Sequence, residues 1–178
     1  GVISLGVGEP DFVTSWNVRE AAILSLEQGY TSYTANAGLL ELRREISDYM
    51  KKFQTTYCPD TEIIVTVGAS QAIDIALRAI LDPGDEVIVL EPSFVSYVPL
   101  VTLAGGTPIQ IQTTEEYDFK VQPTELEKAI SGKTKAILLC SPNNPTGTML
   151  NKEDLEQIAL IAEKHDLTTA ELSKLNKG

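Results

Sequence analysis

The 178-residue sequence has little of what several protein classes require. It has two cysteines, one histidine and no Cys-x-x-Cys pair, so neither a disulfide framework nor a thiolate or histidine metal site is expected. Its 14 basic residues are outnumbered by 25 acidic ones, for a net charge of −11, which argues against binding to nucleic acid or an anionic membrane. The longest apolar runs, such as residues 87–90 and 136–140, fall far short of the roughly 20 residues that cross a bilayer. We therefore predict a cytoplasmic protein.

What is present is typical of a globular chain. Apolar residues make up 43% and charged residues 22% of the sequence, both near globular averages. The length favours one domain, or one domain and part of a second. The chain begins at Gly1 and opens directly on apolar residues, which predicts a fragment of a longer protein.

Helical and strand patterns alternate along most of the chain. Apolar spacing predicts two early helices over residues 15–28 and 38–52. Short apolar runs then predict strands at 63–67, 86–90, 108–112 and 136–140, each followed by a helix, at 69–81, 94–104, 123–131 and 151–165. Continuous apolar strands separated by helices indicate an α/β fold, with a mostly parallel sheet covered on both faces.

Ligands of open α/β sheets bind at the carboxyl ends of strands, so the loops there are the candidate binding segments. Gly68, Ala69 and Ser70 follow the first predicted strand and open a helix. Free N–H groups and the helix dipole favour a phosphate there. An ordinary strand-to-helix turn is the plain alternative. A Rossmann nucleotide site is another, with Glu91 at the next strand end as the ribose-binding acid, although Gly-x-Gly-x-x-Gly is absent.

Two further loops carry candidate ligand-binding residues. Phe94 follows the strand that ends near Glu91, and an aromatic ring there can lie against a planar ligand or simply pack between helix and sheet together with Tyr97. The string Ser-Pro-Asn-Asn-Pro-Thr-Gly at 141–147 has more constraints than a plain turn requires. Its prolines fix the backbone, either X–Pro bond can be cis, and a fixed asparagine can donate to a ligand oxygen.

Together these motifs resemble the class I/II aminotransferases, the fold-type-I pyridoxal-phosphate enzymes of the aspartate aminotransferase type. The string at 141–147 is close to a signature of that family. Gly-Val-Gly-Glu-Pro-Asp-Phe at 6–12, and Tyr33 followed by Gly-Leu-Leu-Glu-Leu-Arg at 38–43, match its earlier motifs. The resemblance covers residues 1 to about 167 in order, the N-terminal portion of the family's chain. Residues 4–38 are most similar to bacterial enzymes for aromatic amino acids or acetylated diaminopimelate.

The resemblance implies roles for particular residues. Gly68, Ala69 and Ser70 would hold the phosphate of pyridoxal 5′-phosphate, Phe94 would stack on its ring, and Asn144 would bond the ring's 3′ oxygen. Two other residues complete the implied set: Tyr33 would reach the phosphate in a neighbouring subunit of a homodimer, and Gly8 would line the pocket for the amino acid and 2-oxo acid substrates. Residues 1–35 would then form an N-terminal arm or part of a small domain, and 36–167 a truncated cofactor-binding domain.

The sequence departs from the family after Leu167. The family's Asp for the pyridinium nitrogen and its Schiff-base Lys cannot be placed, and residues 168–178 are predicted to be a non-family tail without a buried strand. Lys174 and Lys177 are interpreted as solvated. The parent protein would be an aminotransferase, whereas this chain alone is expected to be inactive. The alternative hypothesis is a non-catalytic module that binds a phosphate ligand or a partner.

Overall fold

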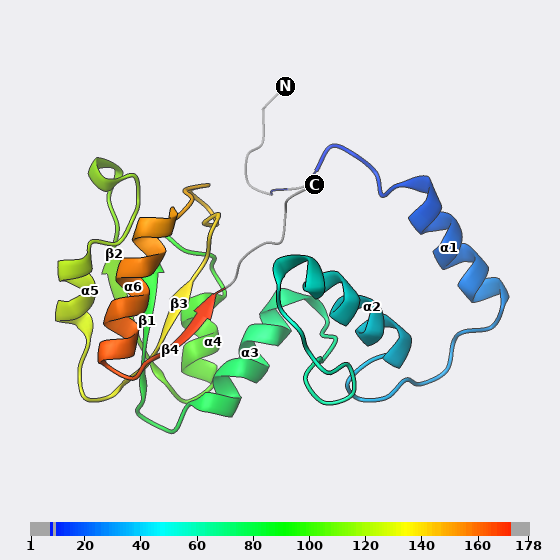
Figure 1. Cartoon of the computed structure of the whole chain (residues 1–178), viewed down its shortest axis with the longest axis horizontal. Helices are drawn as coiled ribbons and strands as arrows, with labels where there is room; N and C mark the ends of the chain where they lie inside the picture. Colours follow the sequence, from blue (N-terminus) through cyan, green and yellow to red (C-terminus); the bar gives the residue numbers. More distant parts are fainter. Residues whose placement is uncertain (1–7, 9, 172–178) are drawn as a thin grey trace. The chain divides into compact units, whose positions relative to one another are not determined.

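The computed structural model describes residue 8 and residues 10–171, and the side chains through residue 168. It divides into two compact units, Gly1–Val65 and Thr66–Gly178. Two sets of residues singled out in the sequence lie outside the described residues. They are Lys174 and Lys177, which are interpreted as solvated, and residues 6, 7 and 9 of the first motif. Figure 1 shows the elements of both units along the chain.

The first unit is helical. It contains α1 (Trp16–Glu27), α2 (Leu40–Met50) and the short 3₁₀ helix η1 (Lys51–Phe53), which confirms the two helices predicted there. Helix α1 has no buried residue, whereas α2 buries Arg43 and Ser47. The Arg43 guanidinium donates to the Pro59 carbonyl at 2.6 Å, and the Ser47 hydroxyl donates to the Tyr57 carbonyl at 2.6 Å. Polar side chains therefore hold α2 against the segment that follows it.

The second unit is a parallel sheet with helices on both faces. In chain order its elements are α3 (Gly68–Ile80), β1 (Glu86–Glu91), α4 (Tyr97–Leu103), β2 (Thr107–Gln112), η2 (Glu115–Tyr117), α5 (Pro123–Ala129), β3 (Thr134–Leu139), α6 (Lys152–Lys164) and β4 (Thr168–Glu171). The strands lie in the order β2-β1-β3-β4 and every neighbouring pair is parallel. The predicted fold class is confirmed.

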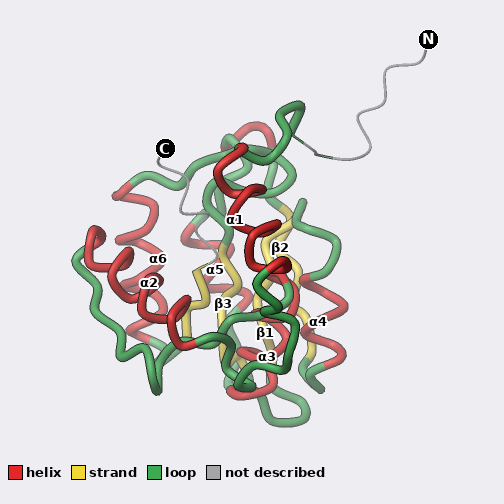
Figure 2. Tube along the Cα trace, turned by 90° about the vertical axis from the view of Figure 1, so that its right-hand side faces the viewer, coloured by secondary structure: helices red, strands yellow, loops and turns green. Residues whose placement is uncertain are grey.

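The two faces of the sheet have separate cores because successive strand residues point to opposite sides. Val87 and Val89 of β1 pack with Leu77 of α3 and Val101 of α4. Between those two valines, Ile88 points the other way, into a cluster with residues of α5 and α6 such as Leu126 and Ile158. Figure 2 shows α4 on one side of the strands and α5 and α6 on the other.

Two strand assignments from the sequence were wrong. Residues 63–67 form no strand, because a strand needs a neighbouring strand to bond with and no strand of the described residues pairs with this segment. Ile64 and Val67 are exposed. Conversely, Thr168–Glu171 forms β4, which pairs with β3 from Ala136 to Leu139. The sequence pattern predicts no buried strand in this tail, and the pairing of β4 with β3 corrects that prediction. The edge of β3 supplies the partner that makes the segment a strand.

Candidate functional site

The N-terminus of α3 offers open backbone donors. Gly68 is its first residue and has a positive φ of +78°, and a Cβ there would meet nothing within 4 Å. No hydrogen bond joins the N–H groups of Ala69 or Ser70 to an acceptor in the part of the chain that the structure describes, and Val67 provides no side-chain cap. Helix α3 packs against β1, and its last residue leads into the amino end of β1. The first residue of α3, Gly68, therefore lies toward the carboxyl end of the sheet. These donors can bind an anion.

The loop after β1 is held by the carboxylate of Glu91. That carboxylate accepts hydrogen bonds from the Ser93 N–H at 2.9 Å, the Ser93 hydroxyl at 3.0 Å and the Gln110 side-chain amide at 3.2 Å. These hydrogen bonds fix the conformation of the turn that carries Phe94. These bonds use the oxygens with which Glu91 would bind a ribose in the nucleotide-site interpretation.

Phe94 lies in this loop just before α4, which begins three residues later than predicted. Its ring is half-buried and meets the ring of Tyr97 edge to face, with centroids 5.7 Å apart and planes at 70°. Tyr97 itself is buried. Burial, with a hydrogen bond to the Cys140 thiol, raises the pKa of Tyr97 well above its usual range. Phe94 thus packs against a buried phenol and is itself only partly buried.

The loop after β3 carries both asparagines. The Ser141–Pro142 and Asn144–Pro145 peptide bonds are cis, as is Glu91–Pro92. The loop closes on itself through the Gly147 N–H, which donates to the Asn143 carbonyl at 2.8 Å. The Asn144 side chain is half-buried, and among the described residues it makes no hydrogen bond. Its amide is therefore available to a ligand.

The structure brings the two loops together. The Asn143 side-chain amide donates to the Pro92 carbonyl at 3.1 Å, across the gap between the two strand ends. Residues of both loops line a small cavity of about 20 Å³, among them Pro92, Tyr97, Cys140 and Asn143. That volume holds about one water molecule. A ligand as large as a vitamin-derived cofactor would have to lie outside it, over the loops.

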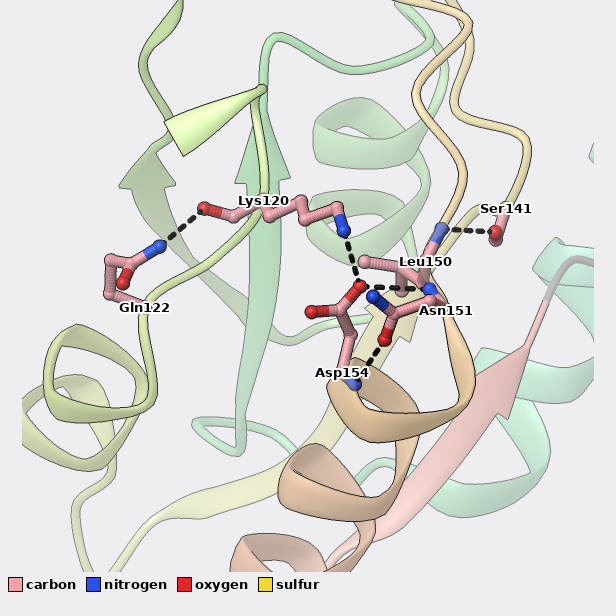
Figure 3. Close-up of polar contacts among 6 residues, drawn as sticks. All are labelled: Lys120, Gln122, Ser141, Leu150, Asn151 and Asp154. Carbon is pink, nitrogen blue, oxygen red and sulfur yellow. Dashed lines mark hydrogen bonds and ion pairs between the residues drawn. The ribbon is translucent and has the colours of Figure 1, made fainter. Parts of the chain in front are cut away.

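The base of the second loop is fixed where α6 begins (Figure 3). The Leu150 N–H donates to the Ser141 hydroxyl at 2.9 Å. Asn151 and Asp154 form a reciprocal capping box, and the Asp154 carboxylate also pairs with the Lys120 ammonium at 2.7 Å. The capping box can be recognised from the spacing of residues 151 and 154. Lys120 could not, because it lies in a different loop.

The other two predicted site residues, Gly8 and Tyr33, belong to the first unit, and both are exposed. Their roles stay predictions. No helix of the described residues is long and apolar enough to cross a membrane. No group of three or more His, Cys, Asp or Glu side chains in the same part of the chain is arranged to hold a metal ion.

The sheet is parallel, has helices on both faces, and has open donors and loops at its carboxyl end, which is where open α/β sheets bind ligands. The model of the family "Aminotransferase class I and II" matches residues 1–169. The chain belongs to this family, which confirms the resemblance.

Individual relatives agree with this assignment. The chain is 64% identical over 168 residues to "Putative aminotransferase YugH" of Bacillus subtilis, covering 94% of the chain and 44% of the relative. It is 46% identical to the aromatic-amino-acid aminotransferase 2 of Thermococcus litoralis, covering 94% of the chain and 43% of that protein. The crystal structure of an aromatic aminotransferase from Pyrococcus horikoshii superposes with a TM-score of 0.92 at 47% identity, covering 96% of the chain and 46% of that structure. The chain therefore spans less than half the length of these relatives.

Proposed function

We propose that the protein containing this chain transfers an amino group between an amino acid and a 2-oxo acid, and that residues 66–178 hold pyridoxal 5′-phosphate for that reaction. The observation that carries the proposal is the set of open groups at the carboxyl end of the sheet. The N–H groups of Ala69 and Ser70 and the amide of Asn144 have no partner among the described residues.

These groups fit the chemical parts of the cofactor. A phosphate prefers backbone N–H groups at a helix N-terminus, and the space beyond Gly68 is open because glycine has no side chain there. Phe94 presents an apolar ring to one face of a planar heterocycle. The Asn144 amide can donate to an oxygen on that ring.

The cofactor, when bound, supplies an electron sink for the negative charge that develops at the substrate's α carbon. The residues of this chain bind and orient. Phe94 excludes water from one face of the ring site. The Asn144 side-chain amide donates a hydrogen bond to the ring oxygen. The N–H groups of Ala69 and Ser70 anchor the phosphate. This fixes one end of the cofactor and so orients its ring toward Phe94 and Asn144.

The roles proposed for Gly8 and Tyr33 rest on the resemblance to the family. Gly8 would lie near the substrate carboxylate, and Tyr33 would reach the cofactor phosphate of the second subunit in a homodimer. The substrates are proposed from the relatives' names, which include aromatic-amino-acid, aspartate and N-acetyl-LL-diaminopimelate aminotransferases. We propose aromatic amino acids or acetylated diaminopimelate first, and aspartate next.

The test is amino transfer by the natural gene product that contains this sequence. The purified protein is given pyridoxal phosphate, one amino acid from each of the three classes, and a 2-oxo acid, and the new amino acid is measured. We expect transfer from at least one class and loss of transfer without cofactor. Phe94→Leu should weaken cofactor binding, whereas Val95→Ala, at the exposed neighbouring position, should not. A protein that binds pyridoxal phosphate but transfers no amino group would refute the activity.

A further inference from the structure

One side chain connects the two loops that carry Phe94 and Asn144. The Asn143 Nδ2 donates to the Pro92 carbonyl at 3.1 Å and to the Thr146 hydroxyl at 2.9 Å. The Asn143 N–H donates to the Thr148 carbonyl at 2.8 Å. All three bonds start at one half-buried residue, directly before Asn144.

The bond to Pro92 differs from the other two. The bonds to Thr146 and Thr148 stay inside the loop that follows β3, so they shape that loop alone. The bond to Pro92 reaches a residue 51 positions earlier in the chain. Among the side-chain hydrogen bonds of the described residues, it is the one that joins residues 141–147 to residues 92–96.

Each end of this bond is close to a proposed cofactor contact. Asn144 follows Asn143, and Phe94 lies two residues after Pro92. The Pro92 end is rigid, since Ser93 is bonded to the Glu91 carboxylate at 2.9 and 3.0 Å. A shift of the second loop relative to Pro92 would therefore change the separation between the Asn144 amide and the Phe94 ring.

We propose that Asn143 is a positioning residue, which sets the Asn144 amide at a fixed place relative to the Phe94 ring through its bond to Pro92. It acts through Asn144 and does not touch the cofactor. This inference rests on the proposed cofactor site. It assigns to the first asparagine of the 141–147 string a role separate from that of the second.

The test compares two nearly isosteric changes in the same loop. Asn143→Leu removes the bonds to both Pro92 and Thr146. Thr146→Val removes the bond between residues 143 and 146 and the bond from the Thr148 N–H to the Thr146 hydroxyl, and it leaves the donor to Pro92. Neither adds a charge near a phosphate site. In titrations of the full chain with pyridoxal 5′-phosphate we expect Kd to rise about fivefold to tenfold for Asn143→Leu, the loss of one hydrogen bond's contribution, and less than about twofold for Thr146→Val.

A double-mutant cycle distinguishes positioning from a general structural role. If Asn143 acts through Asn144, then Asn143→Leu should change Kd by less than about twofold once Asn144→Ala is present. Equal losses with and without Asn144 would overturn the inference. If wild-type protein fails to bind the cofactor, the proposed cofactor site is wrong and the inference falls with it. Wild-type binding that Asn143→Leu leaves unchanged refutes the inference alone.

A second measurement needs no cofactor. Amide hydrogen exchange on the cofactor-free chain should be faster in both 92–97 and 143–148 for Asn143→Leu, and faster only in 143–148 for Thr146→Val. Exchange that changes in one loop only for Asn143→Leu would contradict the link. If Asn143→Leu does not fold, Asn143→Ser, whose shorter side chain cannot span the gap to Pro92, is expected to give the same pattern.

Discussion

The ion pair between Lys120 and Asp154 gives the sharpest prediction about stability. The ammonium and carboxylate are 2.7 Å apart, and each side chain is only 25% exposed. Asp154 also accepts from the Asn151 N–H at 2.8 Å as part of the α6 capping box. One carboxylate therefore fixes the start of α6 and joins it to the segment that precedes α5.

Two substitutions separate these contributions. Asp154→Asn keeps an oxygen for the Asn151 N–H and removes the charge, so it should lower the free energy of unfolding by about 1 kcal/mol, near the upper end for a partly exposed pair. Asp154→Ala also removes the capping acceptor, which should cost about 1 kcal/mol more. The Asn variant thus reports the charge and the Ala variant adds the cap.

The charge contribution should depend on pH in a definite direction. Desolvation raises the pKa of Asp154, but the hydrogen bond from Lys120, the Asn151 N–H and the Lys120 charge outweigh it, so the pKa lies below its ordinary value. The folded carboxylate then stays ionised to lower pH than the unfolded one. Its stabilisation is present above the unfolded pKa of about 3.9 and disappears as the pH falls through the folded pKa.

The assay must report on residues 66–178. The single tryptophan, Trp16, lies in the other unit, so amide exchange of β1 and β3 at pH 7 and near pH 2 is the better readout. Glu153→Gln is the matched control, because Glu153 lies in the same first turn without an ion pair among the described residues. Equal losses for Asp154→Asn and Glu153→Gln, or a difference that persists in acid, would refute the reasoning.

Three further predictions test the packing of the second unit. Leu126→Ala should cost about 2–5 kcal/mol in chemical denaturation because Leu126 is fully buried, whereas Leu160→Ala, at an exposed site, should stay within about 0.5 kcal/mol; equal effects would contradict the assigned core. Gly106→Ala should destabilise by about 1–3 kcal/mol, since its Cβ would lie 2.9 Å from the nearest leucine side chain, and Gly132→Ala, with nothing within 4 Å, is the control. Burial raises the pKa of Tyr97, so stability should fall as pH rises above about 10, where the unfolded phenol ionises first. Alkaline titration by ultraviolet absorbance should show a late-ionising tyrosine that Tyr97→Phe removes, and its survival in that variant would contradict the assignment.

The sequence predicted the elements whose signals are local. Residues 87–89 are a continuous apolar run and became the fully buried centre of β1. Pro123 opens α5 at a position that needs no backbone donor. Asn151 and Asp154 carry the α6 cap within four residues. In each case the determining contacts lie within one element or between a strand and its adjacent helices.

The strand errors have a different origin. Residues 63–67 have the composition of a strand and lack a strand partner among the described residues, whereas 168–171 have a partner in β3 although they contain no continuous apolar run. Strand formation depends on a neighbouring edge, which composition does not encode.

In the candidate site, too, the residues with local signals were predictable and the long-range contacts were not. The strand-end positions of Gly68, Phe94 and Asn144 follow from where the apolar runs stop. The link from Asn143 to Pro92 could not be predicted, because it joins residues 51 positions apart. The pairing of Lys120 with Asp154 likewise joins the segment before α5 to the first turn of α6, and only the folded sheet brings these together. Such contacts depend on the order of the strands.

The central claim is that three segments of residues 66–178 form one cofactor site, and amide NMR of the full chain during a titration with pyridoxal 5′-phosphate tests it most directly. The account predicts saturable shifts in residues 68–71, 92–97 and 143–147, with pyridoxal lacking the phosphate binding more weakly. Shifts confined to other segments, or equal binding of both compounds, would contradict it.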